Sequence, residues 1–175
     1  MSRRISLNMR RMMDAASTDE VEVVLLSFTH PSLDRPVRLS TDNADRISRD
    51  PLVYGTRSTW DGADPDADPY LFVVADAVLP GDLEDGPTPA HLVLDNLDAS
   101  IAEILQSFTD YASVRMAVVF ASAPNEIVAE FHELTLISAT GTASEITLQI
   151  SRLPIEDETV PMERFTKNRF PGLFR

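Results

Sequence analysis

Alternation of apolar and polar residues dominates the second half of the chain. In Glu145–Arg152, Ile146, Leu148 and Ile150 fall at every second position, with polar side chains between them. Such alternation is typical of antiparallel strands that have one buried and one solvated face. The strands predicted from this pattern are 114–120, Ile127–Phe131, Leu134–Ser138 and Glu145–Arg152.

The first half of the chain predicts a strand of a different kind. Val21–His30 (VEVVLLSFTH) is apolar and β-branched at both odd and even positions, which indicates a strand buried on both faces. Turn residues separate it from the strands that follow. Those further strands are predicted at Pro36–Thr41, Tyr70–Leu79 and Ala90–Asn96.

Helical periodicity is confined to two places. A helix is predicted at about 98–109, with Asp98 as its N-cap and a single apolar stripe. The stripe consists of Ile101, Ile104, Leu105 and Phe108. Met1–Glu20 has the pattern of a short amphipathic helix, which would be marginal by itself in water.

Residues 42–69 interrupt the regular pattern. They are rich in Asp and contain three prolines, with only scattered apolar residues. We therefore expect a long acidic surface loop here, with at most one short strand around Leu52–Thr56.

Several short strands, turn signals and one helix predict a mainly β fold. We expect an antiparallel β-sandwich or barrel-like domain with one packed α-helix, flanked by N- and C-terminal docking arms. The expected boundaries are a basic arm at 1–19, a core domain at 20–155 and a docking arm at 156–175.

The distribution of charge separates the arms from the body. The net charge is −13, while residues 1–13 carry +4 and residues 162–175 carry +3, which leaves −20 between them. A body with this much negative charge argues against DNA binding through phosphate contacts. Basic arms could instead lie on the acidic bodies of neighbouring subunits, or they could be solvated tails.

The last stretch, Pro161–Arg175 (PMERFTKNRFPGLFR), places aromatic and apolar residues between bases. Exposed, these side chains would favour aggregation, so we expect them to be buried, either on this chain or on a partner. The predicted partner-docking residues are Arg164, Phe165, Lys167, Arg169, Phe170, Pro171, Gly172, Leu173 and Phe174.

Motifs for catalysis are missing from the sequence. The chain has no cysteine, no G-x-S-x-G elbow and no phosphate-binding glycine loop, and its histidines, His30, His91 and His132, lie far apart. We expect no enzymatic activity and no cofactor. Because no run approaches about 18 apolar residues, no membrane span is expected, and no secretory signal is recognised.

The acidic segment allows two binding hypotheses. Asp64, Asp66 and Asp68 have the first spacings of a calcium loop, but Pro69 and Ala75 occupy positions where an EF-hand has Gly and Glu. A solvated acidic loop is the simpler interpretation.

Trp60 and Tyr70 flank the same segment and could form a sugar-binding platform, although such aromatics are more often packing residues. A cell-wall hydrolase is the weakest alternative, since nothing in the sequence selects a catalytic pair of carboxylates.

Several segments together resemble a family of minor tail proteins of phages and prophages, a domain of unknown function. They are Val24–Pro31 (VLLSFTHP) with Pro36–Val37–Arg38, Leu92–Ile101 (LVLDNLDASI), Val118–Val128 (VVFASAPNEIV) and Arg164–Phe174 (RFTKNRFPGLF). The terminal R-F-P-G-L-F is the most specific of them. The chain departs from the family in residues 42–69, where the loop is longer.

The resemblance implies a structural protein of the tail tip or baseplate of a long-tailed phage or gene transfer agent. It implies that the protein is located in the virion tail and assembled in the host cytoplasm. The implied partners are copies of itself in a ring and neighbouring tail proteins, with DNA passing through an acidic lumen without sequence-specific binding. A carbohydrate- or receptor-binding module at the tail tip is the alternative.

Overall fold

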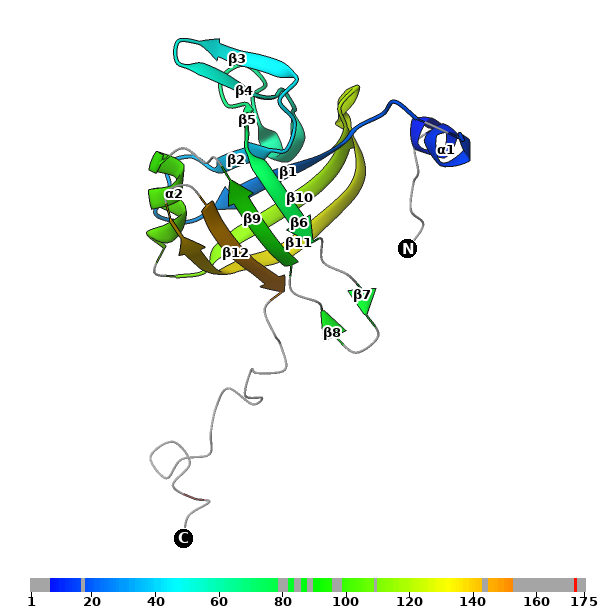
Figure 1. The fold of residues 1–175 in the computed structure, drawn as a ribbon. Coiled ribbons are helices and arrows are strands. Elements are labelled where there is room, and N and C mark those ends of the chain that lie inside the picture. Colours follow the sequence, from blue (N-terminus) through cyan, green and yellow to red (C-terminus); the bar gives the residue numbers. More distant parts are fainter. Residues whose placement is uncertain are drawn as a thin grey trace.

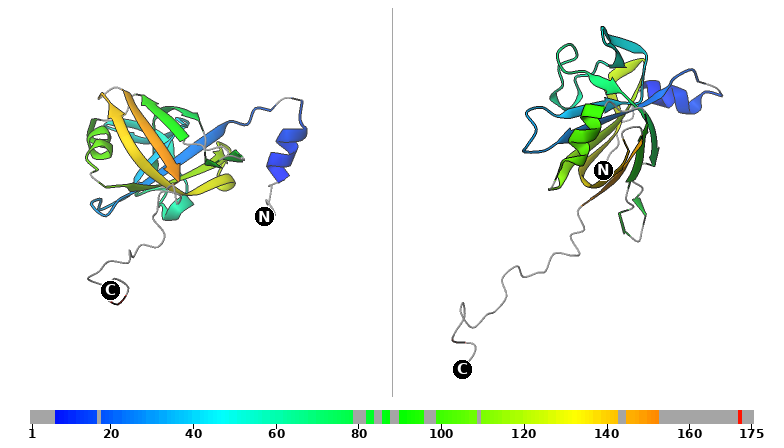
Figure 2. Two further views of the ribbon diagram at one scale, coloured as in Figure 1. Left: turned by 90° about the horizontal axis from the view of Figure 1, so that it is seen from below. Right: turned by 60° about the vertical axis from the view of Figure 1, so that its left-hand side comes forward.

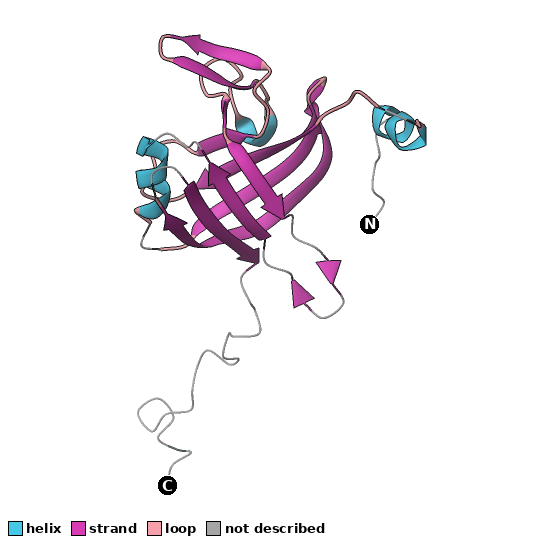
Figure 3. Cartoon of the chain, viewed as in Figure 1, coloured by secondary structure: helices cyan, strands magenta, loops and turns pink. Residues whose placement is uncertain are grey.

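The structure, a computed structural model, is mainly β (Figures 1 and 3). The residues that it describes are 7–16, 18–78, 82–83, 86–87, 90–95, 99–108, 110–142, 145–152 and 172. In chain order the elements are α1 (Leu7–Asp14), β1 (Glu22–Thr29), β2 (Val37–Ser40), β3 (Asp45–Arg49), β4 (Leu52–Thr56), η1 (Trp60–Gly62), β5 (Tyr70–Phe72), β6 (Val74–Val78), β7 (Asp82–Leu83), β8 (Gly86–Pro87), β9 (Ala90–Asp95), α2 (Ala99–Gln106), β10 (Ala112–Phe120), β11 (Ala123–Gly141) and β12 (Glu145–Arg152).

Ten strands form one curled sheet in the order β3-β4-β5-β2-β1-β10-β11-β12-β9-β6, and β7 and β8 form a separate two-stranded ladder. The curl gives a half-barrel, with α2 lying over one end (Figure 1). The predicted mainly β class with one short packed helix is therefore confirmed. The described residues do not form the two packed sheets of a sandwich.

The strand predicted at Tyr70–Leu79 is divided in two, and this division shapes the sheet. β5 pairs with β4 and, in parallel, with β2, whereas β6 pairs with β9 at the other end of the strand order. Only Val73 separates them, and its amide donates to the carbonyl of Ser40 at 2.8 Å. Because one continuous segment belongs to both parts of the sheet, the sheet must curl.

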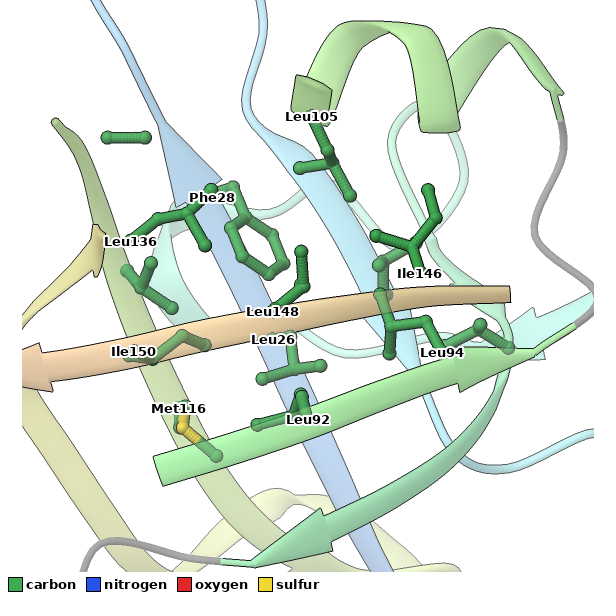
Figure 4. Packing of buried hydrophobic residues seen from close by; sticks show 14 of the residues in the cluster. Leu26, Phe28, Leu92, Leu94, Leu105, Met116, Leu136, Ile146, Leu148 and Ile150 are labelled. Carbon is green, nitrogen blue, oxygen red and sulfur yellow. The ribbon is translucent and has the colours of Figure 1, made fainter. Parts of the chain in front are cut away.

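Strand β1 is buried on both faces, as the apolar run Val21–His30 predicted, and so is the second half of its neighbour β10, from Met116 to Phe120. Leu25 and Leu26 point to opposite faces, and both are fully buried. The inner face encloses the larger core (Figure 4). Its buried members are Leu26, Phe28, Leu39, Val73, Leu92, Leu94, Ala102, Leu105, Ala112, Val114, Met116, Leu134, Leu136, Ile146, Leu148 and Ile150.

A second, smaller core lies on the outer face of the same two strands. Its buried members are Val23, Leu25, Trp60, Ala63, Tyr70, Ala117 and Val119. Trp60 and Ala63 come from the segment between β4 and β5, so that segment covers the back of the sheet.

The prediction of a long acidic surface loop at 42–69 with at most one short strand is wrong in its strand content. Strand β4 coincides with the predicted Leu52–Thr56, but a further strand, β3, pairs with it to form a hairpin. Ile47 and Val53 are half-buried within it, so even its few apolar residues are enough to hold two strands together. The remainder of the segment packs on the outer face.

The long strand β11 replaces the two strands predicted at Ile127–Phe131 and Leu134–Ser138. Its first part pairs with β10 and its last part with β12, and register shifts mark the change of partner. Glu133, at φ 58°, lies in this region. A bend within one strand thus joins the two predicted segments.

Helix α2 confirms the predicted amphipathic stripe and ends at Gln106. Ala102 and Leu105 are buried in the inner core, and Ile101 and Phe108 pack against it. The proposed N-cap, Asp98, lies outside the described residues.

Helix α1 falls within the stretch predicted to be a short amphipathic helix. A linker connects it to β1, and it lies apart from the sheet in every view (Figures 1 and 2). Within the described part of the chain, neither α1 nor α2 is long and apolar enough to cross a membrane.

We expect Gly55→Ala to destabilise the fold by about 1–3 kcal/mol, because a methyl group at this position would overlap the carbonyl oxygen of Tyr70 across the β4–β5 ladder. Urea unfolding measures the change. Gly62→Asn is the matched control: Gly62 has φ +69°, which Asn tolerates, and nothing lies near its added Cβ. Equal effects of the two substitutions would contradict the close β4–β5 contact.

Candidate functional site

A buried arginine holds the outer segment against the sheet. Arg38, on β2, is 7% exposed and forms an ion pair with Asp68. It also donates to the backbone carbonyl of Asp61 at 3.0 Å and lies 5.9 Å from the ring centroid of Tyr70. An arginine removed from water needs such partners. The contacts of Arg38 therefore hold the outer segment in place.

Asp61 is the second anchor of the outer segment. Its backbone is in the left-handed region, with φ 52°. One carboxylate oxygen accepts a hydrogen bond from Ser27 Oγ at 2.6 Å, and the other accepts from Arg115. The segment is therefore tied to β1, β2 and β10 at once.

These contacts contradict the calcium-loop hypothesis. Asp68 is engaged by Arg38, and an oxygen of Asp64 accepts hydrogen bonds from the amides of Asp66 and Ala67. Those amides lower the pKa of Asp64. Among the described residues, no group of three or more His, Asp or Glu is placed to hold a metal ion.

Trp60 and Tyr70 do not form the hypothesised sugar platform, because both are packing residues. Trp60 is 6% exposed and Tyr70 is fully buried, and their rings lie 5.8 Å apart. Trp60 Nε1 donates to Glu130 at 2.8 Å, and the Tyr70 hydroxyl donates to the carbonyl of Trp60 at 2.8 Å. A sugar would need an exposed ring face.

The histidines have separate environments. His30 stacks on Phe108 with the ring centroids 4.6 Å apart. His132 Nε2 lies 3.3 Å from a carboxylate oxygen of Glu130. The side chain of His91 lies outside the described residues.

A shallow hollow of about 340 Å³ opens where β1 ends and β10 begins. It is lined by Thr29, His30, Pro31, Tyr111 and Ser113. Tyr111 is 63% exposed. Nδ1 of His30 accepts a hydrogen bond from the Ser32 amide at 3.1 Å. The hollow thus combines an exposed ring with polar side chains.

The most exposed apolar surface on a strand pair belongs to the β3–β4 hairpin. Leu52 is 60% exposed and Tyr54 is 39% exposed. Arg46 lies opposite Tyr54 and Arg49 opposite Leu52 in the register. Opposed residues of antiparallel strands share a face, so one side of the hairpin presents two apolar and two cationic side chains.

The sequence did not single out this hairpin face. The usable signal was DRISRDPLVYG, in which a Pro-containing turn joins two short stretches that each hold a central β-branched residue. The surrounding aspartates hid that signal.

Helix α1 is a second projecting surface. Leu7 is 72% exposed, and Arg10 and Arg11 are exposed as well. The helix therefore presents one exposed leucine together with two exposed arginines.

The predicted docking residues of the C-terminus lie outside the described residues, apart from Gly172, which is exposed. The structure therefore does not test the role of Arg164, Phe165 or the residues that follow them.

A comparison with protein-family models and with curated proteins finds no match to this chain. The functional argument therefore rests on the residues and on their geometry.

We expect Tyr70→Phe to remove part of the alkaline sensitivity of the fold. Burial raises the pKa of Tyr70 to about 12, from an ordinary value of 10.0. The unfolded chain thus loses this proton first, and stability falls as pH rises from about 10 towards 12.

At pH 8 the variant should lose about 1 kcal/mol, because the Trp60 carbonyl loses its hydrogen bond. Urea unfolding between pH 8 and alkaline pH compares the two proteins. If the difference between the two free energies of unfolding stays constant over that pH range, the raised pKa of Tyr70 is contradicted.

Proposed function

We propose that this protein is a structural, non-enzymatic subunit that docks against other protein chains. One observation carries the proposal: two elements, α1 and the β3–β4 hairpin, project from a compact body and expose apolar residues beside arginines. Exposed groups of this kind mark protein interfaces.

The use of the acidic residues supports a structural role. Asp61 and Asp68 hold arginines of the same chain, and Asp64 stabilises its own turn. Carboxylates bound in this way maintain the shape of the outer segment, and that shape sets the position of the hairpin.

The resemblance to phage minor tail proteins specifies the setting of this docking. The protein is a component of the tail tip or baseplate, located in the virion and assembled in the host cytoplasm. A barrel-like domain with docking arms on both sides suits a ring of identical subunits. A body of net negative charge would repel DNA phosphates in the lumen and let DNA slide.

The C-terminal segment has a part in this assembly. Phe165, Phe170, Leu173 and Phe174 act as apolar anchors in a partner's pocket, while Arg164, Lys167 and Arg169 pair with its acids.

We expect a chain ending at Pro161 to remain a folded monomer while the full chain forms rings or complexes with other tail proteins. Light scattering and circular dichroism make the comparison. In the full-length chain, Phe170→Ala/Phe174→Ala tests the anchors directly and should weaken association about 30-fold or more.

Unfolding of the truncated chain would mean that the segment belongs to its own core. Unchanged association of both variants would contradict its role as a docking arm.

A second candidate function is a carbohydrate- or receptor-binding module at the tail tip, favoured by the hollow at Tyr111. The exposed Tyr111 ring offers a stacking face. The hydroxyls of Thr29 and Ser113 face each other across the β1–β10 ladder and offer neutral hydrogen bonds. This combination suits a sugar ring better than an ion.

If the hollow binds glycans, Tyr111→Ala should weaken that binding about tenfold, because the stacking contact is lost. A glycan array followed by calorimetry on any glycan that binds makes the test. Tyr54→Ala removes the exposed hairpin tyrosine and should leave glycan affinity unchanged. Absence of binding to every glycan removes this candidate.

A further inference from the structure

The hairpin face formed by Arg46, Arg49, Leu52 and Tyr54 is unexplained by the fold. Its four side chains are exposed, and the hairpin extends from the top of the molecule in Figure 1. Among the described residues, the guanidinium groups of Arg46 and Arg49 pair with no carboxylate.

The neighbouring Arg57 shows the contrast. It lies 3.4 Å from Asp45 and 3.8 Å from Asp66, so its charge is used within the chain. Three arginines occur in residues 41–98 against thirteen acids, and the two that remain unpaired flank Leu52 and Tyr54. Tyrosine and arginine beside an apolar residue is the composition of interface hot spots.

A complementary surface lies elsewhere on the same chain, where β10 turns into β11. Val21 is 59% exposed and Ile127 is 42% exposed. The carbonyl of Val21 accepts the amide of Ala121 at 3.0 Å, and Ile127 lies opposite Val119. Both apolar side chains therefore belong to one end of the sheet.

Exposed acidic residues lie close to both of these in the chain. Asp19 is two residues before Val21, and Glu126 directly precedes Ile127. Glu20 accepts a hydrogen bond from Ser122 at 2.7 Å, which fixes the linker before β1 against the β10–β11 turn. We call the set Asp19, Val21, Glu126 and Ile127 the acid–apolar patch.

We infer that the hairpin face of one copy docks on the acid–apolar patch of a second copy. This rests on the proposed function, that the chain works by docking in an assembly. Each surface pairs two apolar residues with two charges, of opposite sign on the two surfaces. Ser58 and Thr59, which follow the hairpin, donate hydrogen bonds to Pro124 and Asn125 of the β10–β11 turn, whereas the hairpin tip points away from that turn (Figure 1). The exposed tip can therefore reach the acid–apolar patch of another copy.

Such a contact is heterologous, because it joins two different surfaces. Repetition of it closes into a ring or continues as a filament, depending on the rotation between copies. The contact thus adds an interface to the proposed ring, beside the contacts of the terminal arms.

The test is a charge exchange in the full chain. One variant carries Arg46→Glu/Arg49→Glu, the other Asp19→Arg/Glu126→Arg, and sedimentation velocity measures association. Each variant alone sets like charges against each other, and we expect its dissociation constant to rise about 30-fold or more. Mixed in equal amounts, the two variants should associate again, since every contact then joins opposite charges.

Matched controls separate this contact from general charge effects. Arg35→Glu reverses an exposed arginine outside the hairpin. Its effect on association is compared with that of the single substitution Arg49→Glu. Glu103→Arg/Glu145→Arg reverses two exposed acids on α2 and β12. Neither control should change association, and Tyr111→Ala should leave it unchanged, whereas Leu52→Ala/Tyr54→Ala should weaken it.

The outcomes distinguish this inference from the proposed function. Self-association that neither exchange variant changes overturns the inference and leaves docking by the terminal arms standing. A chain that stays monomeric at millimolar concentration also overturns it, and the complexes with other tail proteins then decide the proposed function. Only association that is lost in each variant and restored in their mixture supports the inference.

Discussion

The central constraint on this fold is that β1 and the second half of β10 are apolar on both faces. Each buried Val, Leu or Phe side chain contributes about 1.5–3 kcal/mol. Leaving Val23, Leu25 and Val119 exposed on the outer face would thus cost roughly 5–9 kcal/mol, which is comparable to the whole stability of a typical domain. A second cover is therefore needed behind the sheet, in addition to the curl that encloses the inner core.

The cover is an acidic, proline-containing segment, and its poverty in apolar residues explains how it is held. Trp60, Ala63 and Tyr70 are its buried members in the outer core, and Arg38 and Asp61 fix its position through their partners. Ser58, Thr59 and Trp60 add hydrogen bonds to β11. Because these ties begin at Ser58, the hairpin before them is free of the outer core. The β3–β4 hairpin projects for this reason, and its exposed face is a by-product of covering the sheet that is then available for binding.

The strands and α2 could be predicted because their signals are local. The alternation in Glu145–Arg152 and the two-faced run Val21–His30 each report burial directly. The outer cover could not be predicted, because Asp61 and Asp68 look like solvated acids until the fold brings Arg115 and Arg38 to them. The same contacts between distant parts of the chain bury Trp60 and Tyr70 in the core, although the sequence allowed them to be ligand contacts. The hairpin face was missed because its exposure depends on where that cover lies.

Net charge and local charge act at different ranges in this molecule. A chain of −13 repels its own copies at long range, yet this repulsion is screened beyond about 8 Å at physiological ionic strength. At contact distance only the nearest charges count, and there Arg46 and Arg49 face whatever the hairpin meets. Charged rims of this kind select the partner and its orientation, while apolar groups that become buried on binding supply most of the affinity. In the inferred contact Leu52 and Tyr54 have this second role. The acidic body then opposes non-specific association, and the two arginines of the hairpin favour one directed contact.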